Sequence, residues 1–164
     1  MSLTKENGKL SPLIEIKGLK ACFYTEEGIV PAVDSIDLVI EPEKTLGVVG
    51  ESGCGKSVTA LSIMRLIQTP PGRIVAGQIL FRRKGETVDL ARLNPRGREM
   101  RDIRGNEIAM IFQEPMTSLN PVYTIGSQIM EAILLHQRLG RREARARAIE
   151  MLQAVGIPSP EQRV

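Results

Sequence analysis

Eight consecutive residues have the types and spacing of a phosphate-binding loop. The pattern G-x-x-x-x-G-K-[ST] is matched in full by Gly50-Glu51-Ser52-Gly53-Cys54-Gly55-Lys56-Ser57. Its glycines let the backbone wrap closely around an anion, so that successive N–H groups point at phosphate oxygens. The ammonium of Lys56 can reach the β- and γ-phosphates, and the hydroxyl of Ser57 can bind Mg²⁺. The loop therefore predicts a site for a nucleoside triphosphate. Cys54 occupies a variable position, where a small residue that fits a tight loop is favoured over a reactive thiol.

A second candidate is Gln113, which directly follows the apolar run 108–112. A phosphate-loop enzyme needs an Asp at the end of a buried strand to hold Mg²⁺, often with a Glu base after it. In that alignment Glu114 would be the base, but Gln113 would stand at the Asp position, where it is a poor substitute. Alternatively, the neutral carbonyl of Gln113 contacts Mg²⁺ or orients the attacking water. A purely structural role at the end of a core strand is the third interpretation.

The elements that position these residues are predicted from hydrophobic periodicity. Alternating residues predict half-buried strands at 14–16 and 36–40, with a turn at 25–28, and short strands at 78–81 and 88–90. Continuous apolar runs at 46–50 and 108–112 predict strands buried on both faces of a sheet. A helix is expected from Lys56 to Gln68, ended by the prolines at 70 and 71. The segment 92–106 is expected to be a surface loop or short helix.

The end of the chain is expected to be a helical pair. One apolar stripe comprises Ile125, Ile129, Ile133 and Leu134; the other comprises Ala144, Ala148, Met151, Leu152 and Val155, stopped by Gly156 and Pro158. His136 lies within the first of these runs and is interpreted as a surface or boundary residue. The arginines at 138, 141, 142, 145 and 147 are interpreted as a solvated helix face.

Composition excludes several classes of protein. The chain has 164 residues, a net charge of +3 and 42% hydrophobic residues, which is enough for one domain with a core and excludes dominant disorder. A pI near 9.1 and 3% aromatic residues argue against a nucleic-acid partner. No apolar run approaches the roughly 20 residues of a spanning helix, and no signal sequence is visible at the start. Cys22 and Cys54 are expected to be reduced thiols.

These residues resemble the ATP-binding subunits of ABC transporters, in particular the importers of the oligopeptide and dipeptide type. The loop 50–57 matches the family's Walker A motif, and Gln113 matches the Q-loop glutamine. The run after it, Glu114-Pro115-Met116-Thr117-Ser118-Leu119-Asn120-Pro121, resembles the peptide-type sequence, as do Ile103-Arg104-Gly105 and Ala32-Val33-Asp34. The resemblance extends from about Leu13 to Arg163. The Walker motif indicates only an NTPase, whereas the run around Gln113 indicates the subfamily.

The resemblance implies a set of site residues. ATP would be bound by 50–57 and Val58, with adenine stacked on Phe23, which would otherwise be interpreted as a core residue. Mg²⁺ would be held by Ser57 and Gln113, and Lys56 and Gln113 would be the catalytic residues. Val58 stands where Ser or Thr is usual, so a hydroxyl contact to the α-phosphate would be missing. Glu43-Lys44 stands where Gly-Glu is common, which affects only a turn.

The resemblance also implies a fold, partners and a location. It implies an α/β P-loop NTPase of ABC type with an antiparallel β portion and a helical subdomain. We expect a flexible N-terminus at 1–12, an ATP-binding core at 13–118 and a partial helical subdomain at 119–164. The subunit would pair with a second ATP-binding subunit, as a homo- or heterodimer, and dock on membrane permease subunits, which receive peptides from an external binding protein. Its place would be the cytoplasmic face of a bacterial or archaeal cell membrane.

Family features needed for turnover are not found in this sequence. ABC ATPases hydrolyse ATP between two subunits, using a signature segment that begins Leu-Ser-Gly-Gly, a strand-end Asp, a catalytic Glu and a switch His; His136 does not fit the last role. The chain is therefore expected to be an N-terminal fragment with an incomplete sheet, because it ends early, and with little or no turnover.

Two alternative functions stay open. A different P-loop NTPase is one; a GTPase would need an Asn-Lys-x-Asp segment, which the sequence lacks, and no acceptor pocket or lid of a kinase is evident. A non-catalytic module that binds nucleotide or a permease is the other.

Overall fold

The computed structural model describes residues 5–6, 9–113 and 118–164. The chain divides into two compact units, Met1–Arg101 and Asp102–Val164, called here the first and second units. Part of the expected N-terminal segment, residues 1–4 and 7–8, lies outside the described residues. So do residues 114–117, which include Glu114 and half of the peptide-type run.

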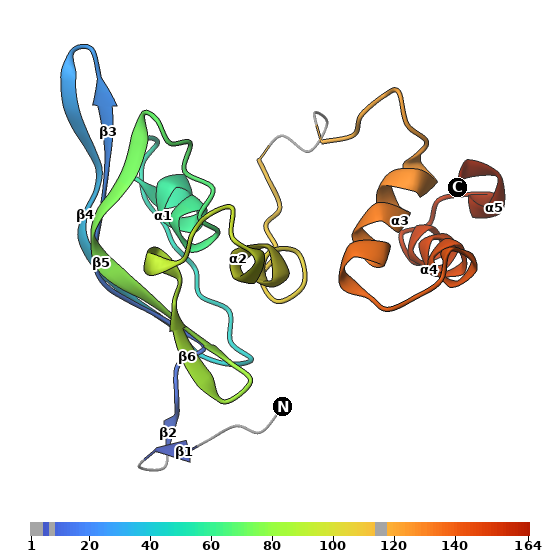
Figure 1. Ribbon diagram of the computed structural model, residues 1–164, viewed down its shortest axis with the longest axis horizontal. Helices are drawn as coiled ribbons and strands as arrows, with labels where there is room; N and C mark the ends of the chain where they lie inside the picture. Colours follow the sequence, from blue (N-terminus) through green and yellow to red (C-terminus); the bar gives the residue numbers. More distant parts are fainter. Residues whose placement is uncertain (1–4, 7–8, 114–117) are drawn as a thin grey trace. The chain divides into compact units, whose positions relative to one another are not determined.

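An antiparallel sheet forms the frame of the first unit (Figure 1). Its strands β3 (Ile14–Thr25), β4 (Gly28–Ile40), β5 (Gly72–Arg83) and β6 (Glu86–Asp89) pair in the order β4-β3-β5-β6. A short pair, β1 (Lys5–Glu6) with β2 (Lys9–Leu10), precedes it. The predicted strands at 14–16, 36–40 and 78–81 are confirmed, each within a longer strand. The strand predicted at 88–90 is present but ends at Asp89, because Leu90 begins the 3₁₀ helix η1 (Leu90–Arg92).

Apolar and polar residues alternate along the strands, and the apolar ones form the core of the first unit. In β3, Ile14 and Ile16 are buried, at 5% and 1% exposure, while Lys17 is exposed. Ile16 pairs with Ile79 of β5, which is fully buried. Each such isoleucine stabilises the fold by roughly 1.5–3 kcal/mol through burial. Leu90 of η1 joins this core with no exposed surface.

The helix after the phosphate-binding loop is shorter than predicted. α1 spans Lys56–Ile63 instead of reaching Gln68, and Met64 caps it. Arg65 adopts a φ of +53°, in the left-handed region, which a continuing right-handed helix cannot contain. The helix therefore ends before the prolines at 70 and 71.

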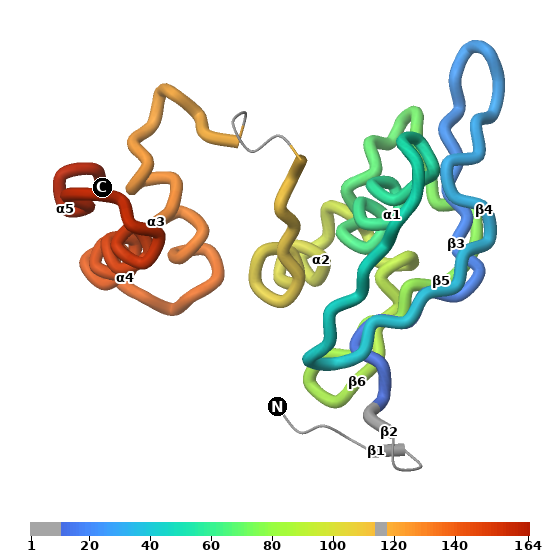
Figure 2. The backbone as a smooth tube through the Cα atoms, turned by 180° about the vertical axis from the view of Figure 1, so that it is seen from behind, coloured from blue at the N-terminus to red at the C-terminus, as the bar shows by residue number. Residues whose placement is uncertain are grey.

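The prediction of two strands buried on both faces of a sheet is wrong. Residues 46–50 form no strand in the connection from β4 to α1 (Figure 2), and Val49 is 98% exposed. Residues 108–112 make only one isolated bridge, between Arg104 and Ile108, and Ile111 is 93% exposed. An apolar run becomes a central strand only when strands pair with it on both edges, and no strand in the described part of the chain pairs with either run.

The segment 92–106, expected to be a surface loop or a short helix, contains the short helix α2 (Arg98–Ile103). Its placement on the surface was only partly correct. Met100 and Ile103 are fully buried, because a helix with apolar residues three apart can bury one stripe.

The second unit is helical, as predicted. α3 (Ile125–His136) and α4 (Arg141–Ala154) pack through Ile133, Ala144 and Ala148, and α5 (Pro160–Arg163) follows. Thr124 caps α3 by accepting a hydrogen bond from the Ser127 N–H at 3.1 Å. The apolar stripe predicted for α4 is wider than its buried face, since Met151 and Val155 are 49% and 73% exposed. Gly156, at a φ of +76°, ends α4 as predicted.

Candidate functional site

The phosphate-binding loop lies directly before α1 and is fixed by glycine conformation. Gly53 and Gly55 have φ values of +83° and +89°, in the region that glycine alone adopts without strain. Gly55 is the N-cap of α1 and packs closely on β4: a Cβ atom there would lie 2.3 Å from the carbonyl oxygen of Ala32. Only glycine therefore lets the loop approach the sheet at this point.

Lys56 curls back into its own loop. Its Nζ donates hydrogen bonds to the carbonyl oxygens of Gly50, at 2.7 Å, and of Glu51, at 2.6 Å. The same nitrogen lies 3.5 Å from Sγ of Cys54. These contacts hold the positive charge of Lys56 against the start of the loop.

The first turn of α1 adds further positive potential. The first N–H groups of an α-helix have no partner within the helix and carry the positive end of its dipole. The next N–H along, that of Thr59, donates to the carbonyl of Gly55 at 2.9 Å. Ser57 is exposed beside these groups, and Val58 is half-buried, its carbonyl accepting from the Ser62 hydroxyl at 2.7 Å. The turn can thus bind an anion at its open end.

Both cysteines are free thiols, as predicted. Cys54 is exposed, and its Sγ lies against Gly50, where an added Cβ would come within 2.6 Å of the sulfur. Glu51 and Ser52 are exposed beside it. The thiol fits the loop as a small residue and also lies beside a cation, so both interpretations of Cys54 stay predictions.

Phe23 is half-buried in β3, where it pairs with Val30 of β4 and Gly72 of β5. A Cβ on Gly72 would lie 2.8 Å from the ring's Cε1, so the absence of a side chain at Gly72 makes room for the ring. The neighbouring Tyr24 is 47% exposed. The arrangement leaves one aromatic packed on the sheet and the next at the surface.

Gln113 belongs to the second unit, whereas the loop residues and Phe23 belong to the first. Gln113 is exposed in an irregular segment, and the strand predicted before it is not formed. His136 ends α3 and is half-buried, which confirms a boundary position. Its Nε2 lies 2.8 Å from where a Cβ on Gly105 would be, so the side chain packs against that turn.

Two features of the structure were missed from the sequence. The carbonyl oxygen of Ala32 leaves no room for a side chain at Gly55, and this backbone contact is not visible in the pattern of side chains. A groove of about 670 Å³ in the second unit was also missed, because Leu134 is predicted only as part of an apolar stripe. Leu134 and Leu135 both line this groove and are 38% and 72% exposed. The available signal was the apolar run Ile133-Leu134-Leu135, which is wider than the stripe that the helix buries, since Ile133 alone of the three is buried.

Comparison with known proteins gives consistent results. Residues 33–164 match the family described as ABC transporter. The chain is 53% identical over 153 residues to a peptide import ATP-binding protein of Brucella melitensis, covering 93% of this chain and 45% of that protein. It is 46% identical over 156 residues to the oligopeptide transport ATP-binding protein OppD of Bacillus subtilis, covering 95% of this chain and 42% of that protein. The chain thus spans less than half the length of these relatives.

Solved structures show the same fold. The dimeric bacterial ABC transporter cassette MJ0796 superposes with a TM-score of 0.70 at 23% identity, covering 85% of this chain and 56% of that one. A state of the same cassette bound to ADP and Pi gives a TM-score of 0.69 at 22% identity. The predicted fold class, a P-loop NTPase of ABC type with an antiparallel β portion and helices, is confirmed.

Proposed function

The chain belongs to the ABC transporter family, and from this premise we propose that it binds ATP at Gly50–Ser57 as part of a peptide-import ATPase. One observation carries the proposal: the complete loop holds the Lys56 ammonium against the Gly50 and Glu51 carbonyls, in front of the N-terminus of α1. A cation and unpaired helix N–H groups at one place form a site for the β- and γ-phosphates. The names of the relatives support peptide import as the parent protein's function.

The residues fit a magnesium nucleotide. The Ser57 hydroxyl is exposed at the first turn of α1, which suits a Mg²⁺ ligand next to bound phosphate. The described residues contain no group of three or more His, Cys, Asp or Glu side chains suited to a metal, so the ion would be held largely by phosphate oxygens. When bound, Mg²⁺ would neutralise charge on the phosphates. Gln113 is the second proposed ligand and would also orient the attacking water; Phe23 would stack on adenine.

We further propose that the parent protein hydrolyses ATP and that this chain alone binds nucleotide without turnover. The sequence contains neither the Leu-Ser-Gly-Gly signature nor the strand-end Asp, catalytic Glu and switch His that the family uses. The proposed domains are a nucleotide-binding core at 13–118 and a helical subdomain at 119–164.

The groove in the second unit supports a permease as partner. It is lined by apolar Tyr123, Leu134 and Leu135 together with Arg141 and Glu131, a mixture that suits a short amphipathic segment of another protein. We propose that permease subunits dock here, that a second ATP-binding subunit completes the assembly, and that an external peptide-binding protein acts through the permease. None of the described helices is both long and apolar enough to span a membrane. The similarity to import ATP-binding proteins supports a peripheral location on the cytoplasmic face of a cell membrane.

Titration calorimetry with Mg-ATP tests nucleotide binding. The wild-type chain is compared with Lys56→Ala and with Lys44→Ala, a matched control that removes an exposed lysine paired only with Glu41. Loss of a charge-assisted hydrogen bond costs about 1.5–3 kcal/mol, so Lys56→Ala should weaken binding by about tenfold or more while Lys44→Ala leaves it unchanged. Equal affinity in all three chains would contradict the site. Steady release of phosphate by the wild-type chain would contradict the proposal that it lacks turnover.

A further inference from the structure

The first unit contains a second pocket, of about 400 Å³, away from the residues of the phosphate-binding loop. It is formed by the segment after α1, the start of β5 and the segment after η1. Two arginines, Arg65 and Arg73, line it together with the apolar side chains of Ile67, Ile74 and Pro95. Apolar walls with a few convergent polar groups are typical of small-molecule sites.

Arg65 has a hydrogen-bond donor that no protein group satisfies. Its Nη2 donates to the carbonyl of Leu93 at 3.2 Å, but its Nε is buried and has no partner within the described part of the chain. Burial lowers the pKa of the Arg65 guanidinium, and the nearby Asp89 carboxylate partly opposes that shift. An arginine stays charged in proteins, so the buried N–H remains a charged donor without an acceptor.

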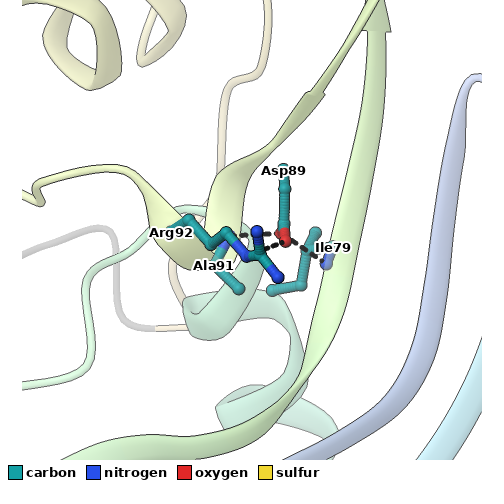
Figure 3. A network of polar contacts seen from close by, with 4 residues as sticks. All are labelled: Ile79, Asp89, Ala91 and Arg92. Atoms are coloured by element: carbon teal, nitrogen blue, oxygen red, sulfur yellow. Dashed lines mark hydrogen bonds and ion pairs between the residues drawn. The ribbon is translucent and has the colours of Figure 1, made fainter.

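The Asp89 carboxylate acts on the Arg65 guanidinium through its charge but forms no hydrogen bond with the Arg65 Nε; its own contacts are drawn in Figure 3. Oδ1 accepts hydrogen bonds from the N–H groups of Ile79 and Ala91, both at 3.1 Å. Oδ2 forms an ion pair with Nε of Arg92 at 3.3 Å, but it is buried and accepts no hydrogen bond within the described residues. Asp89 therefore links β5 to η1 through its hydrogen bonds, and the Arg65 Nε has no hydrogen-bond partner.

Arg73 provides the second cation. Its residue is exposed at the start of β5, and within the described residues its side chain makes no hydrogen bond or ion pair. The hydroxyl of Thr69, also in the lining, donates to the carbonyl of Gly72 at 2.7 Å and so offers the pocket no further donor. The free donors of the pocket are thus guanidinium groups.

We propose that this pocket binds a small organic oxyanion, a phosphate monoester or a carboxylate, between Arg65 and Arg73, with its apolar part against Ile67 and Ile74. A planar guanidinium binds such oxyanions through paired hydrogen bonds. Arg73, which has no partner among the described residues, and the guanidinium of Arg65, which also lines the pocket, would donate to the oxyanion from two sides. The lining of this pocket includes no residue of the phosphate-binding loop.

The test uses the ¹⁵N-labelled chain titrated with phenyl phosphate, benzoate and, as a neutral probe, benzyl alcohol. Amide shifts at Thr69, Arg73 and Ile74 are expected with both anions and not with the alcohol. Shifts with phenyl phosphate alone would assign the site to phosphate esters, and shifts with benzoate alone would assign it to carboxylates. Shifts confined to Gly53 and Ser57, or equal shifts with all three probes, would overturn the proposal.

Two variants separate the pocket from general charge effects. Arg73→Gln should weaken anion binding by about tenfold or more, since one charge-assisted pair is lost, while Arg96→Gln, at an exposed arginine outside the lining, should leave it unchanged. Lys56→Ala should also leave it unchanged, which distinguishes this site from the phosphate-binding loop. Equal affinity in Arg73→Gln and the wild-type chain would refute the inference.

Discussion

Replacing Gly55 by Ala tests whether its close approach to β4 holds the phosphate-binding loop in place. Gly55 has a φ of +89°, and a Cβ there would lie 2.3 Å from the Ala32 carbonyl oxygen. An L-residue in the left-handed region costs about 1–2 kcal/mol. The overlap falls about 1 Å short of normal contact, and forcing backbone apart in a packed region costs a further 1–3 kcal/mol or so. The expected loss is therefore about 2–5 kcal/mol.

Two other glycines provide matched controls. Gly53, in the same loop, and Gly85, in the turn between β5 and β6, have φ values of +83° and +87°, but neither has an atom within 4 Å of an added Cβ. Gly53→Ala and Gly85→Ala should thus lose only the conformational part, about 1–2 kcal/mol. The comparison isolates the steric overlap, because φ is nearly the same at all three positions.

The assays are urea unfolding followed by circular dichroism, amide hydrogen exchange in α1, and Mg-ATP titration. For a chain of this size, roughly 2–4 °C of Tm is lost per kcal/mol, so Gly55→Ala should also melt about 4–20 °C lower. Exchange should accelerate in α1, since its N-cap is displaced, and nucleotide affinity should fall more than in Gly53→Ala. If Gly55→Ala unfolds and binds like Gly85→Ala, the close approach does not organise the loop and the reasoning fails.

Three further changes test other parts of the chain. Ile79→Ala removes a fully buried side chain from the sheet core and should cost about 2–5 kcal/mol of unfolding free energy in urea, whereas Val75→Ala, at a 42% exposed position of the same strand, should cost much less. Asp89→Ala leaves the N–H groups of Ile79 and Ala91 without an acceptor and should lower the free energy of unfolding by about 1–3 kcal/mol. Arg92→Ala removes only the exposed ion-pair partner, and a loss in Asp89→Ala as small as in Arg92→Ala would argue against the network. Thr124→Ala removes the cap of α3 and should cost about 1 kcal/mol and speed amide exchange of Ser127, while an unchanged exchange rate would show that the cap is not needed.

The sequence by itself determined the features that depend on neighbours a few residues away. The phosphate-binding loop is one, because the order of glycines, Lys56 and Ser57 fixes both its backbone conformations and its chemistry. The faces of β3 and β4 are another, since a period of two places Ile14 and Ile16 together whatever lies opposite. The end of α4 followed from Gly156 for the same local reason, whereas the cap of α3 by Thr124 was found only in the structure.

Only the tertiary structure decided what depends on segments far apart in the chain. The runs at 46–50 and 108–112 have the composition of central strands, yet a strand exists only where other strands pair with it, and none of the described ones does so here. The end of α1 depends on the left-handed Arg65, and no sequence signal marks that conformation in an arginine. The pocket of Arg65 and Arg73 likewise arises because a loop, a strand and a 3₁₀ helix meet in space, which residue spacing along the chain does not record.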